Sequence, residues 1–259
     1  MCIRDRVRGL ADATMYTGEA TVRFYGGRRP GGPPVVVYYP PVDTERFVPS
    51  PELRAATRAE LGVPAHAPLV GMVANVAPEK GVEHFVAAAA LVLQSEPAAH
   101  FVLVGHSLPN HAEHEGRIEA ELRRTGLPRE RLIRTGYRTD LERIYPALDV
   151  KLVTSRSEGV STAALEAMGC GVPVVATDVG GLAEVVEEGV TGAVVPPGDP
   201  RALAHATLLL LRDPERRAAL ARGARERAVR RWGVEACADA HERAFEAAQA
   251  GHGRRLTRE

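Results

Sequence analysis

Short apolar runs alternate with helical patterns along most of the chain. The runs that we interpret as strands occupy residues 34–39, 69–74, 101–104, 132–133, 150–153, 172–176 and 193–195. Segments with helical spacing lie at residues 51–61, 81–93, 113–124, 141–147, 161–168 and 182–188. Near-continuous apolar strands separated by helices are typical of a parallel sheet covered on both faces. The pattern predicts an α/β protein with a doubly wound, Rossmann-like parallel sheet, whose ligand crevice lies at the carboxyl ends of the strands.

The two ends of the chain follow other patterns. Residues 7–33 are rich in Gly, Arg and Pro, which predicts a linker or loop, with a helix over residues 13–24. Ala- and Arg-rich segments at residues 200–212, 214–232 and 234–250 predict C-terminal helices, and residues 251–259 are expected to fray. The first six residues, MCIRDR, resemble a translated sequencing-adapter leader, so we expect the natural protein to begin upstream.

Composition changes this picture little. The chain is 45% hydrophobic and 25% charged with a formal net charge of zero, which argues against bulk attraction to nucleic acid or anionic membrane. Its three widely spaced cysteines form neither a disulfide framework nor a metal-ligand pair. No apolar run approaches the roughly 18 residues that span a bilayer, and no secretory leader is visible. These features predict a cytoplasmic protein.

The richest stretch for chemistry is residues 155–181, where Glu158 and Glu166 flank a loop-to-helix junction. Backbone N–H groups at a helix N-terminus lack intrahelical partners and favour an anion. Ser161 or Thr162 is a natural N-cap and could also meet a phosphate. The two carboxylates could accept hydrogen bonds from sugar hydroxyls. The competing interpretation is a capped helix with two solvated glutamates.

A second stretch, residues 70–81, ends a strand and places Lys80 in the first turn of the next helix. A lysine there opposes the helix dipole, unless an anion such as a diphosphate binds to it and to the free amides. A solvated Lys80 paired with Glu79 is the alternative.

Two further strand-end loops hold candidate residues. Gly105 would let a ligand approach the backbone closely, and the neighbouring histidines 106, 111 and 114 are interpreted as surface residues rather than metal ligands. Tyr137 and Arg138 could cover a base or pair with a phosphate. Alternatively this loop is a turn in which Thr139 or Asp140 caps the next helix.

The order of these segments resembles the C-terminal, donor-binding domain of the retaining glycosyltransferases of family 4, which have the two-domain GT-B architecture. The resemblance runs from about residue 34 to 232. The matching segments are VDTERF (42–47), PEKG (78–81), LVG (103–105), GYRTDL (136–141), SEGVSTAALEAMGCGVPVVATDVGG (157–181) and GAVVPPGDPRAL (192–203).

The resemblance implies roles for individual residues. Lys80 would contact the donor diphosphate, Glu158 the donor sugar hydroxyls and Glu166 the ribose hydroxyls. The start of the helix would face the phosphates, and the loop at 136–138 would lie near the base. The remaining donor-binding residues implied are Asn75, Gly105, Tyr137, Arg138, Gly159, Val160, Ser161 and Thr162. The chain departs from the family at Asn75, where many members carry an arginine; an asparagine can donate hydrogen bonds to the diphosphate but supplies no charge.

The resemblance also implies a domain division. Residues 1–33 would hold the leader, a remnant of the N-terminal acceptor domain and a linker; residues 34–232 would bind the nucleotide sugar; residues 233–259 would form a helix and frayed tail. Most of the acceptor domain would then be absent, and the isolated fragment inactive.

The expected function is transfer of a sugar from a UDP- or GDP-sugar to an acceptor, with retention at the anomeric carbon and no metal or other cofactor. The implied partners are the donor and the missing N-terminal domain, without nucleic acid, and with peripheral membrane association only for a full-length enzyme. Two alternatives stay open: a nucleotide-sugar epimerase of GT-B architecture, and a module that binds nucleotide without turnover.

Overall fold

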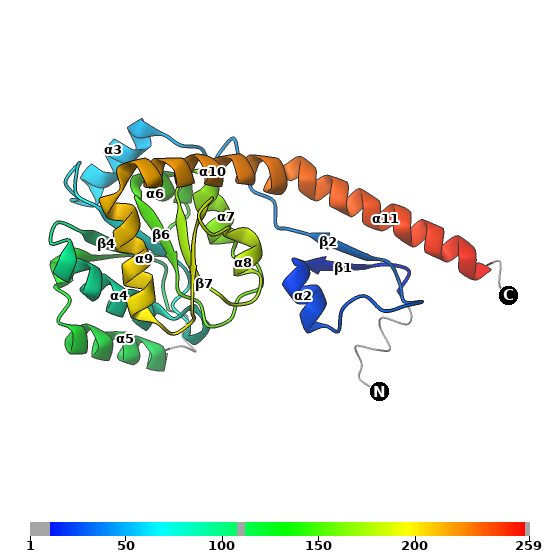
Figure 1. Ribbon diagram of the computed structural model, residues 1–259, viewed down its shortest axis with the longest axis horizontal. Helices are drawn as coiled ribbons and strands as arrows, with labels where there is room; N and C mark the ends of the chain where they lie inside the picture. The colour runs from blue at the N-terminus through cyan, green and yellow to red at the C-terminus, as the bar shows by residue number, and fades with distance from the viewer. Residues whose placement is uncertain (1–10, 108–111, 257–259) are drawn as a thin grey trace.

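The computed structural model describes residues 11–107 and 112–256; the proposed leader at 1–6 and the final three residues lie outside this part. Its main lobe is built on a six-stranded, all-parallel sheet of order β5-β4-β3-β6-β7-β8 (Figure 1). The strands are β3 (Leu69–Val73), β4 (His100–Val104), β5 (Leu132–Gly136), β6 (Val150–Val153), β7 (Val174–Thr177) and β8 (Gly192–Val195). The doubly wound, Rossmann-like sheet predicted from the sequence is confirmed.

Helices cover both faces of the sheet because the strands are apolar on both sides. One core contains residues of α4, α5 and α9, and the other contains residues of α6, α7, α8 and α10. The helices of this lobe are α3 (Pro51–Glu60), α4 (Val82–Ser95), α5 (Ala112–Thr125), α6 (Leu141–Ala147), α7 (Thr162–Gly169), α8 (Leu182–Val185), α9 (Pro200–Arg212) and α10 (Pro214–Trp232), with 3₁₀ turns η1 (Pro78–Lys80) and η3 (Arg129–Arg131). On β6, Val150 and Leu152 enter the first core and Val153 the second, as the alternation of a strand requires.

The order in which successive strands are added to the sheet reverses between β3 and β6. From β3 the chain proceeds outward through β4 to β5, and it then returns to β6 on the other side of β3. The crossover helices diverge at such a switch point and leave a crevice at the carboxyl ends of the two strands. The fold itself therefore places the candidate site between the ends of β3 and β6.

A smaller lobe joins the two ends of the described chain. It comprises β1 (Thr14–Thr17), α2 (Glu19–Phe24), the parallel partner strand β2 (Val35–Tyr38) and the long helix α11 (Val234–Leu256), which packs on β2 (Figure 1). The predicted helix over 13–24 is wrong in its first half, because Thr14 to Thr17 pair with β2 and the helix begins only after Gly18. α11 also continues as a helix beyond residue 250, where fraying was expected.

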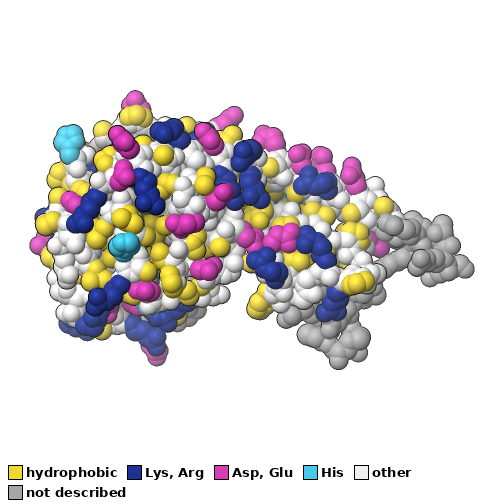
Figure 2. Space-filling model, viewed as in Figure 1, with side chains coloured by type: hydrophobic (Ala, Val, Ile, Leu, Met, Phe, Trp, Pro, Cys, Tyr) yellow, Lys and Arg dark blue, Asp and Glu magenta, His cyan; other side chains and the backbone are white. Residues whose placement is uncertain are grey.

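The other boundaries differ from the expectations in small ways. β7 starts two residues later than the apolar run at 172–176, and α8 is a single turn rather than a helix over 182–188. Across the described residues, no helix combines the length and the apolar character needed to cross a bilayer. Basic and acidic side chains are interspersed over the face seen in Figure 2, in keeping with the net charge of zero.

Candidate functional site

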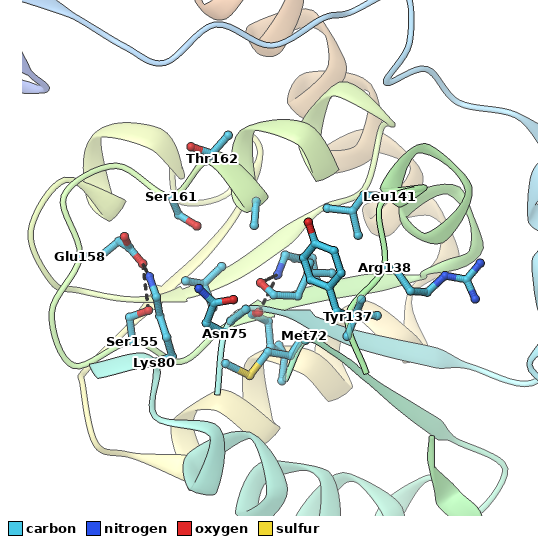
Figure 3. Close-up of a pocket in the computed structure, with 18 of the residues that line it drawn as sticks. Met72, Asn75, Lys80, Tyr137, Arg138, Leu141, Ser155, Glu158, Ser161 and Thr162 are labelled. Carbon is cyan, nitrogen blue, oxygen red and sulfur yellow. Dashed lines mark hydrogen bonds and ion pairs between the residues drawn. The ribbon is translucent and has the colours of Figure 1, made fainter. Parts of the chain in front are cut away.

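An open pocket of about 310 Å³ lies at the switch point, between the carboxyl ends of β3 and β6 and the start of α7 (Figure 3). It collects most of the residues that the sequence singled out. The candidates that line it are Asn75, Lys80, Gly105, Tyr137, Arg138, Glu158, Val160, Ser161 and Thr162. They come from the four connections that follow β3, β4, β5 and β6, which supports the expectation of a crevice at this edge of the sheet.

Lys80 is placed by the end of β6. It closes the 3₁₀ turn η1, and the Thr154 hydroxyl donates to the carbonyls of both Lys80 and Gly81 at 2.9 Å. Gly81 has φ +61°, and a Cβ there would come within 2.3 Å of the Thr154 carbonyl oxygen. The prediction that Lys80 belongs to the first turn of a helix is therefore wrong, because α4 begins only at Val82, after the left-handed Gly81.

Lys80 pairs with Glu158 rather than with Glu79. The Lys80 Nζ lies 2.7 Å from Glu158 Oε2, and the Ser155 hydroxyl donates to the same oxygen at 3.1 Å (Figure 3). Only 12% of the Glu158 side chain is exposed, so it is not the solvated glutamate of the competing interpretation. The pair joins η1 to the β6–α7 loop across the pocket mouth and holds a cation and an acceptor side by side.

The start of α7 forms the opposite wall of the pocket. Ser161 is its N-cap, and its hydroxyl accepts a hydrogen bond from the Ala164 N–H at 3.3 Å. Val160, Ser161, Thr162 and Ala163 line the pocket, and the first amides of a helix lack intrahelical partners, which favours a bound anion. Gly159 lies behind this wall, where its carbonyl accepts from the Gly181 N–H at 2.8 Å. Gly159 is not one of the described residues that line the pocket.

Glu166 lies deeper, on the second turn of α7. Its Oε2 accepts a hydrogen bond from the Tyr145 hydroxyl at 2.8 Å, and the described lining of the pocket does not include it. Burial raises the pKa of Glu166, opposed by the Tyr145 hydrogen bond and the charge of Lys151. The structure therefore brings Glu166 behind the pocket floor rather than to its mouth.

The β5–α6 loop presents a ring and a guanidinium already engaged. Tyr137 is 68% exposed, and its ring meets that of His106 edge to face. Arg138 is paired with Asp140 at 2.6 Å and with Glu60 at 2.5 Å, and in Figure 3 it points away from Lys80. Asp140 occupies the N-cap position of α6, yet its carboxylate holds Arg138 instead of the helix amides. The Tyr137 ring is thus exposed at the pocket beside His106, whereas Arg138 would have to give up these carboxylate partners to bind a phosphate.

At the end of β4, the backbone conformation and close packing require a glycine at position 105. Its φ is +137°, and a Cβ there would lie 1.9 Å from the Ala74 carbonyl oxygen, so the adjoining strand end requires glycine whether or not a ligand binds. Asn75, which follows the end of β3, lines the pocket beside it.

The histidine interpretation needs a correction. His106 is exposed, but His114 is buried, with its Nε2 at 3.5 Å from Glu83 Oε2, because α5 packs against α4 at this point. His111 lies outside the described residues. Within the described residues, no group of three side chains is suited to hold a metal ion.

Sequence reasoning missed Lys151. It was included in the apolar run at 150–153, but its side chain is buried and lines the pocket floor. Burial lowers the pKa of this amine to about 7. The signal was available: a lysine interrupts a buried strand, in a chain with two lysines among 33 basic residues.

The model of a protein family described as glycosyl transferases group 1 matches residues 67–213. Among curated proteins, the D-inositol 3-phosphate glycosyltransferase of Saccharomonospora viridis is 37% identical over 198 residues, which are 74% of this chain and 45% of that protein. A GDP-mannose-dependent monoacylated alpha-(1-6)-phosphatidylinositol monomannoside mannosyltransferase of Corynebacterium glutamicum is 31% identical, over 86% of this chain and 59% of its own.

Solved structures agree with this similarity. The Anabaena protein Alr3699/HepE in complex with UDP superposes with a TM-score of 0.83 at 28% identity, over 91% of this chain and 64% of that one. The sucrose-phosphate synthase of Thermosynechococcus elongatus gives a TM-score of 0.78 at 32% identity, over 97% and 60%. The chain spans about half the length of the first curated relatives that it matches.

Proposed function

This chain belongs to the group 1 glycosyltransferases, and from that membership and the pocket geometry we propose that it binds the nucleotide-sugar donor of a sugar-transfer reaction. In the proposed reaction the bond between the anomeric carbon and the diphosphate breaks, and a new bond to an acceptor hydroxyl forms with retention of configuration. A second domain, as the resemblance to the two-domain GT-B architecture implies, would supply the acceptor site.

The observation that carries the proposal is the arrangement of Lys80, Glu158 and the start of α7 around one crevice. The leaving diphosphate gains negative charge as the sugar departs, and an ammonium group with preorganised helix amides stabilises that charge. Glu158, next to Lys80, is an acceptor for sugar hydroxyls. We assign the diphosphate to Lys80, Asn75 and the amides of residues 160–162. On the family resemblance we assign the ribose to Glu166, which must come forward from behind the pocket floor to reach it.

In this proposal the Lys80–Glu158 pair changes partners when the donor arrives. The Glu158 carboxylate keeps Lys80 in place in the empty pocket. When the donor binds, Lys80 contacts the diphosphate and Glu158 accepts hydrogen bonds from the sugar hydroxyls. The Ser155 hydroxyl, which also donates to Glu158, holds that carboxylate while Lys80 turns to the phosphates.

Binding of UDP and GDP to the chain tests the proposal. We expect one of the two nucleotides to raise the melting temperature and bind with a calorimetric Kd in the micromolar to low millimolar range. Lys80→Met should weaken binding by about tenfold or more, since it removes a charged hydrogen-bond donor. Glu158→Gln should leave the affinity for the nucleotide equal or slightly higher, because the competing carboxylate is gone, and should weaken the sugar-bearing donor relative to it.

Absence of binding by either nucleotide at millimolar concentration would contradict the proposal. Equal affinities of the unaltered chain and Lys80→Met would overturn the role of Lys80. Incubation with UDP-glucose or GDP-mannose, followed by analysis of the released sugar, separates a transferase from an epimerase, which would return an isomerised nucleotide sugar.

A further inference from the structure

Both lysines of this chain lie in the same pocket. The other basic residues are all arginines, so Lys80 and Lys151 are the only primary amines on side chains in the sequence. Lys80 stands at the mouth and Lys151 on the floor, where β6 passes β3. Lys151 therefore differs from the charged residues on the surface of the chain, because it is a buried amine in the pocket.

Lys151 is costly to bury without a counter-charge. Its side chain is only about 1% exposed, and its Nζ donates to the carbonyl oxygens of Val73 at 3.4 Å and Leu152 at 3.3 Å. These are long hydrogen bonds to neutral acceptors, which compensate an ammonium group poorly. A β-branched or aliphatic residue would satisfy this strand position at less cost.

The other cations at the pocket already have carboxylate partners. Lys80 is paired with Glu158, and Arg138 with Asp140 and Glu60. Among the described residues that line the pocket, Lys151 is the cation with no carboxylate within ion-pair distance. An anion that enters the pocket therefore meets one uncompensated positive group, at its floor.

The charged groups around Lys151 come from three directions. The charge of Glu166, which accepts from the Tyr145 hydroxyl of α6, acts on it from α7, and Lys80 and Glu158 act from the pocket mouth. The neighbouring strands β3 and β7 carry no ionisable side chains. Glu166 gives its Oε2 to Tyr145 and forms no direct pair with Lys151 among the described contacts.

We propose that Lys151 is a ligand-binding cation of this pocket, which contacts the anionic phosphate part of the nucleotide donor from below, while Lys80 contacts it from the mouth. The inference rests on the proposed function. It assigns to Lys151 the second positive charge that the position of Asn75 does not supply.

The burial of Lys151 adds a property that can be measured. With its pKa lowered to about 7, the amine is partly neutral in the empty pocket at neutral pH. A phosphate group nearby stabilises the ammonium form and raises this pKa. Binding of the nucleotide near pH 7.5 then takes up a proton at Lys151.

The competing interpretation is a structural one, in which Lys151 only ties β6 to the end of β3 through the Val73 carbonyl. A third possibility is that Lys151 acts through Glu166 on the ribose. The three interpretations differ in which ligand loses affinity when the amine is removed. The experiment therefore compares the affinity for a nucleoside diphosphate with that for its nucleoside.

The variant is Lys151→Met, whose unbranched side chain is one heavy atom shorter and carries no charge. Its control is Arg131→Met, which removes one positive charge beside the start of β5, at the opposite edge of the sheet. Binding of UDP or GDP, whichever the chain takes, is measured by calorimetry, and binding of the matching nucleoside by chemical-shift titration. We expect Lys151→Met to weaken the nucleotide by about tenfold or more and the nucleoside by less than twofold, with no change for the control.

Proton uptake gives a second readout. Since the chain has two lysines, labelling of lysine with ¹³C at Cε yields two side-chain signals, which Lys151→Met assigns. The Lys151 signal should titrate near pH 7 in the free chain and at least one pH unit higher with nucleotide bound. Calorimetry in two buffers of different ionisation enthalpy should show proton uptake that the variant lacks.

Each outcome decides between the interpretations. Unchanged nucleotide affinity in a folded Lys151→Met variant, or a Lys151 titration that nucleotide does not move, overturns the inference and leaves the proposed function intact if Lys80→Met still loses affinity. An equal loss for nucleotide and nucleoside assigns the effect to Glu166 and also overturns it. Failure of the unaltered chain to bind either nucleotide overturns the proposed function and the inference together.

Discussion

At Lys151, burial of the amine couples the stability of the fold to pH. Its pKa is about 7 in the folded chain, against roughly 10.4 for an unfolded lysine. Between these two values the unfolded state binds a proton that the folded state does not. The free energy of unfolding therefore rises with pH through this window, and the penalty for burying the charge is fully present below pH 7.

We expect this slope to disappear in Lys151→Met. Chemical unfolding at several pH values from 6 to 9 should show the variant more stable than the unaltered chain at pH 6, with the difference shrinking as pH rises. The slope for one proton is at most about 1.4 kcal/mol per pH unit. A constant difference across this range would show that the buried amine does not titrate there.

Individual site residues were predictable where a polar group interrupts an otherwise simple pattern at the end of a strand. Lys80 and Glu158 stood out in this way and lie together in the pocket. Their mutual ion pair was not predictable, because their separation of 78 positions carries no local signal. Lys151 was overlooked because the run at residues 150–153 remains apolar on average even with one charged residue in it. Arg138 looked available because its partner Glu60 lies far away in the sequence.

On the scale of secondary-structure elements, the sequence predicted the alternation of strands and helices of the main lobe, and α6, α9 and α10 begin and end where expected. Strong apolar periodicity and the prolines that open α9 and α10 account for this success. β1 was mistaken for a helix, since a strand of four residues is defined by its pairing with β2 rather than by its own pattern.

The turn that carries Lys80 gives an element-scale prediction. Gly81→Ala places a Cβ against the Thr154 carbonyl in a left-handed conformation, so η1 must shift relative to β6. We expect a loss of about 2 kcal/mol or more in the free energy of unfolding and a clear loss of nucleotide affinity.

Gly62→Ala is the matched control for this change. Gly62 has φ +69°, close to that of Gly81, but no atom lies within 4 Å of a Cβ built there. Gly62→Ala should lower the free energy of unfolding by about 1 kcal/mol, from conformational strain alone, and should leave the nucleotide affinity unchanged. If both variants lose the same stability and both still bind nucleotide normally, the contact with Thr154 does not position Lys80.

For the whole molecule, the junction between the two lobes depends on Glu184 of α8. Its carboxylate accepts hydrogen bonds from the Glu19 backbone N–H at 2.8 Å, from Arg23 at 2.8 Å and from the Tyr39 hydroxyl at 3.0 Å. All three donors belong to the small lobe or to the segment that follows β2. Burial, with the charge and hydrogen bond of Glu184, raises the pKa of Tyr39 to about 12.

Glu184→Ala should therefore loosen the small lobe from the main one, because it leaves the Glu19 amide and the Tyr39 hydroxyl without their acceptor, at a cost of about 1–3 kcal/mol. We expect faster tryptic cleavage at the arginines of the small lobe and a lower pKa for Tyr39 in an ultraviolet titration. Arg28→Ala is the control: its partner Glu19 belongs to the same lobe and the pair is exposed, so the Tyr39 pKa and the rate of cleavage after the other arginines of the small lobe should not change. A Cβ at Gly18 would lie 3.0 Å from Val160, which lines the pocket, so the small lobe also lies directly behind this part of the pocket wall. If Glu184→Ala leaves both the cleavage rate and the Tyr39 titration unchanged, the hydrogen bonds of Glu184 do not hold the two lobes together.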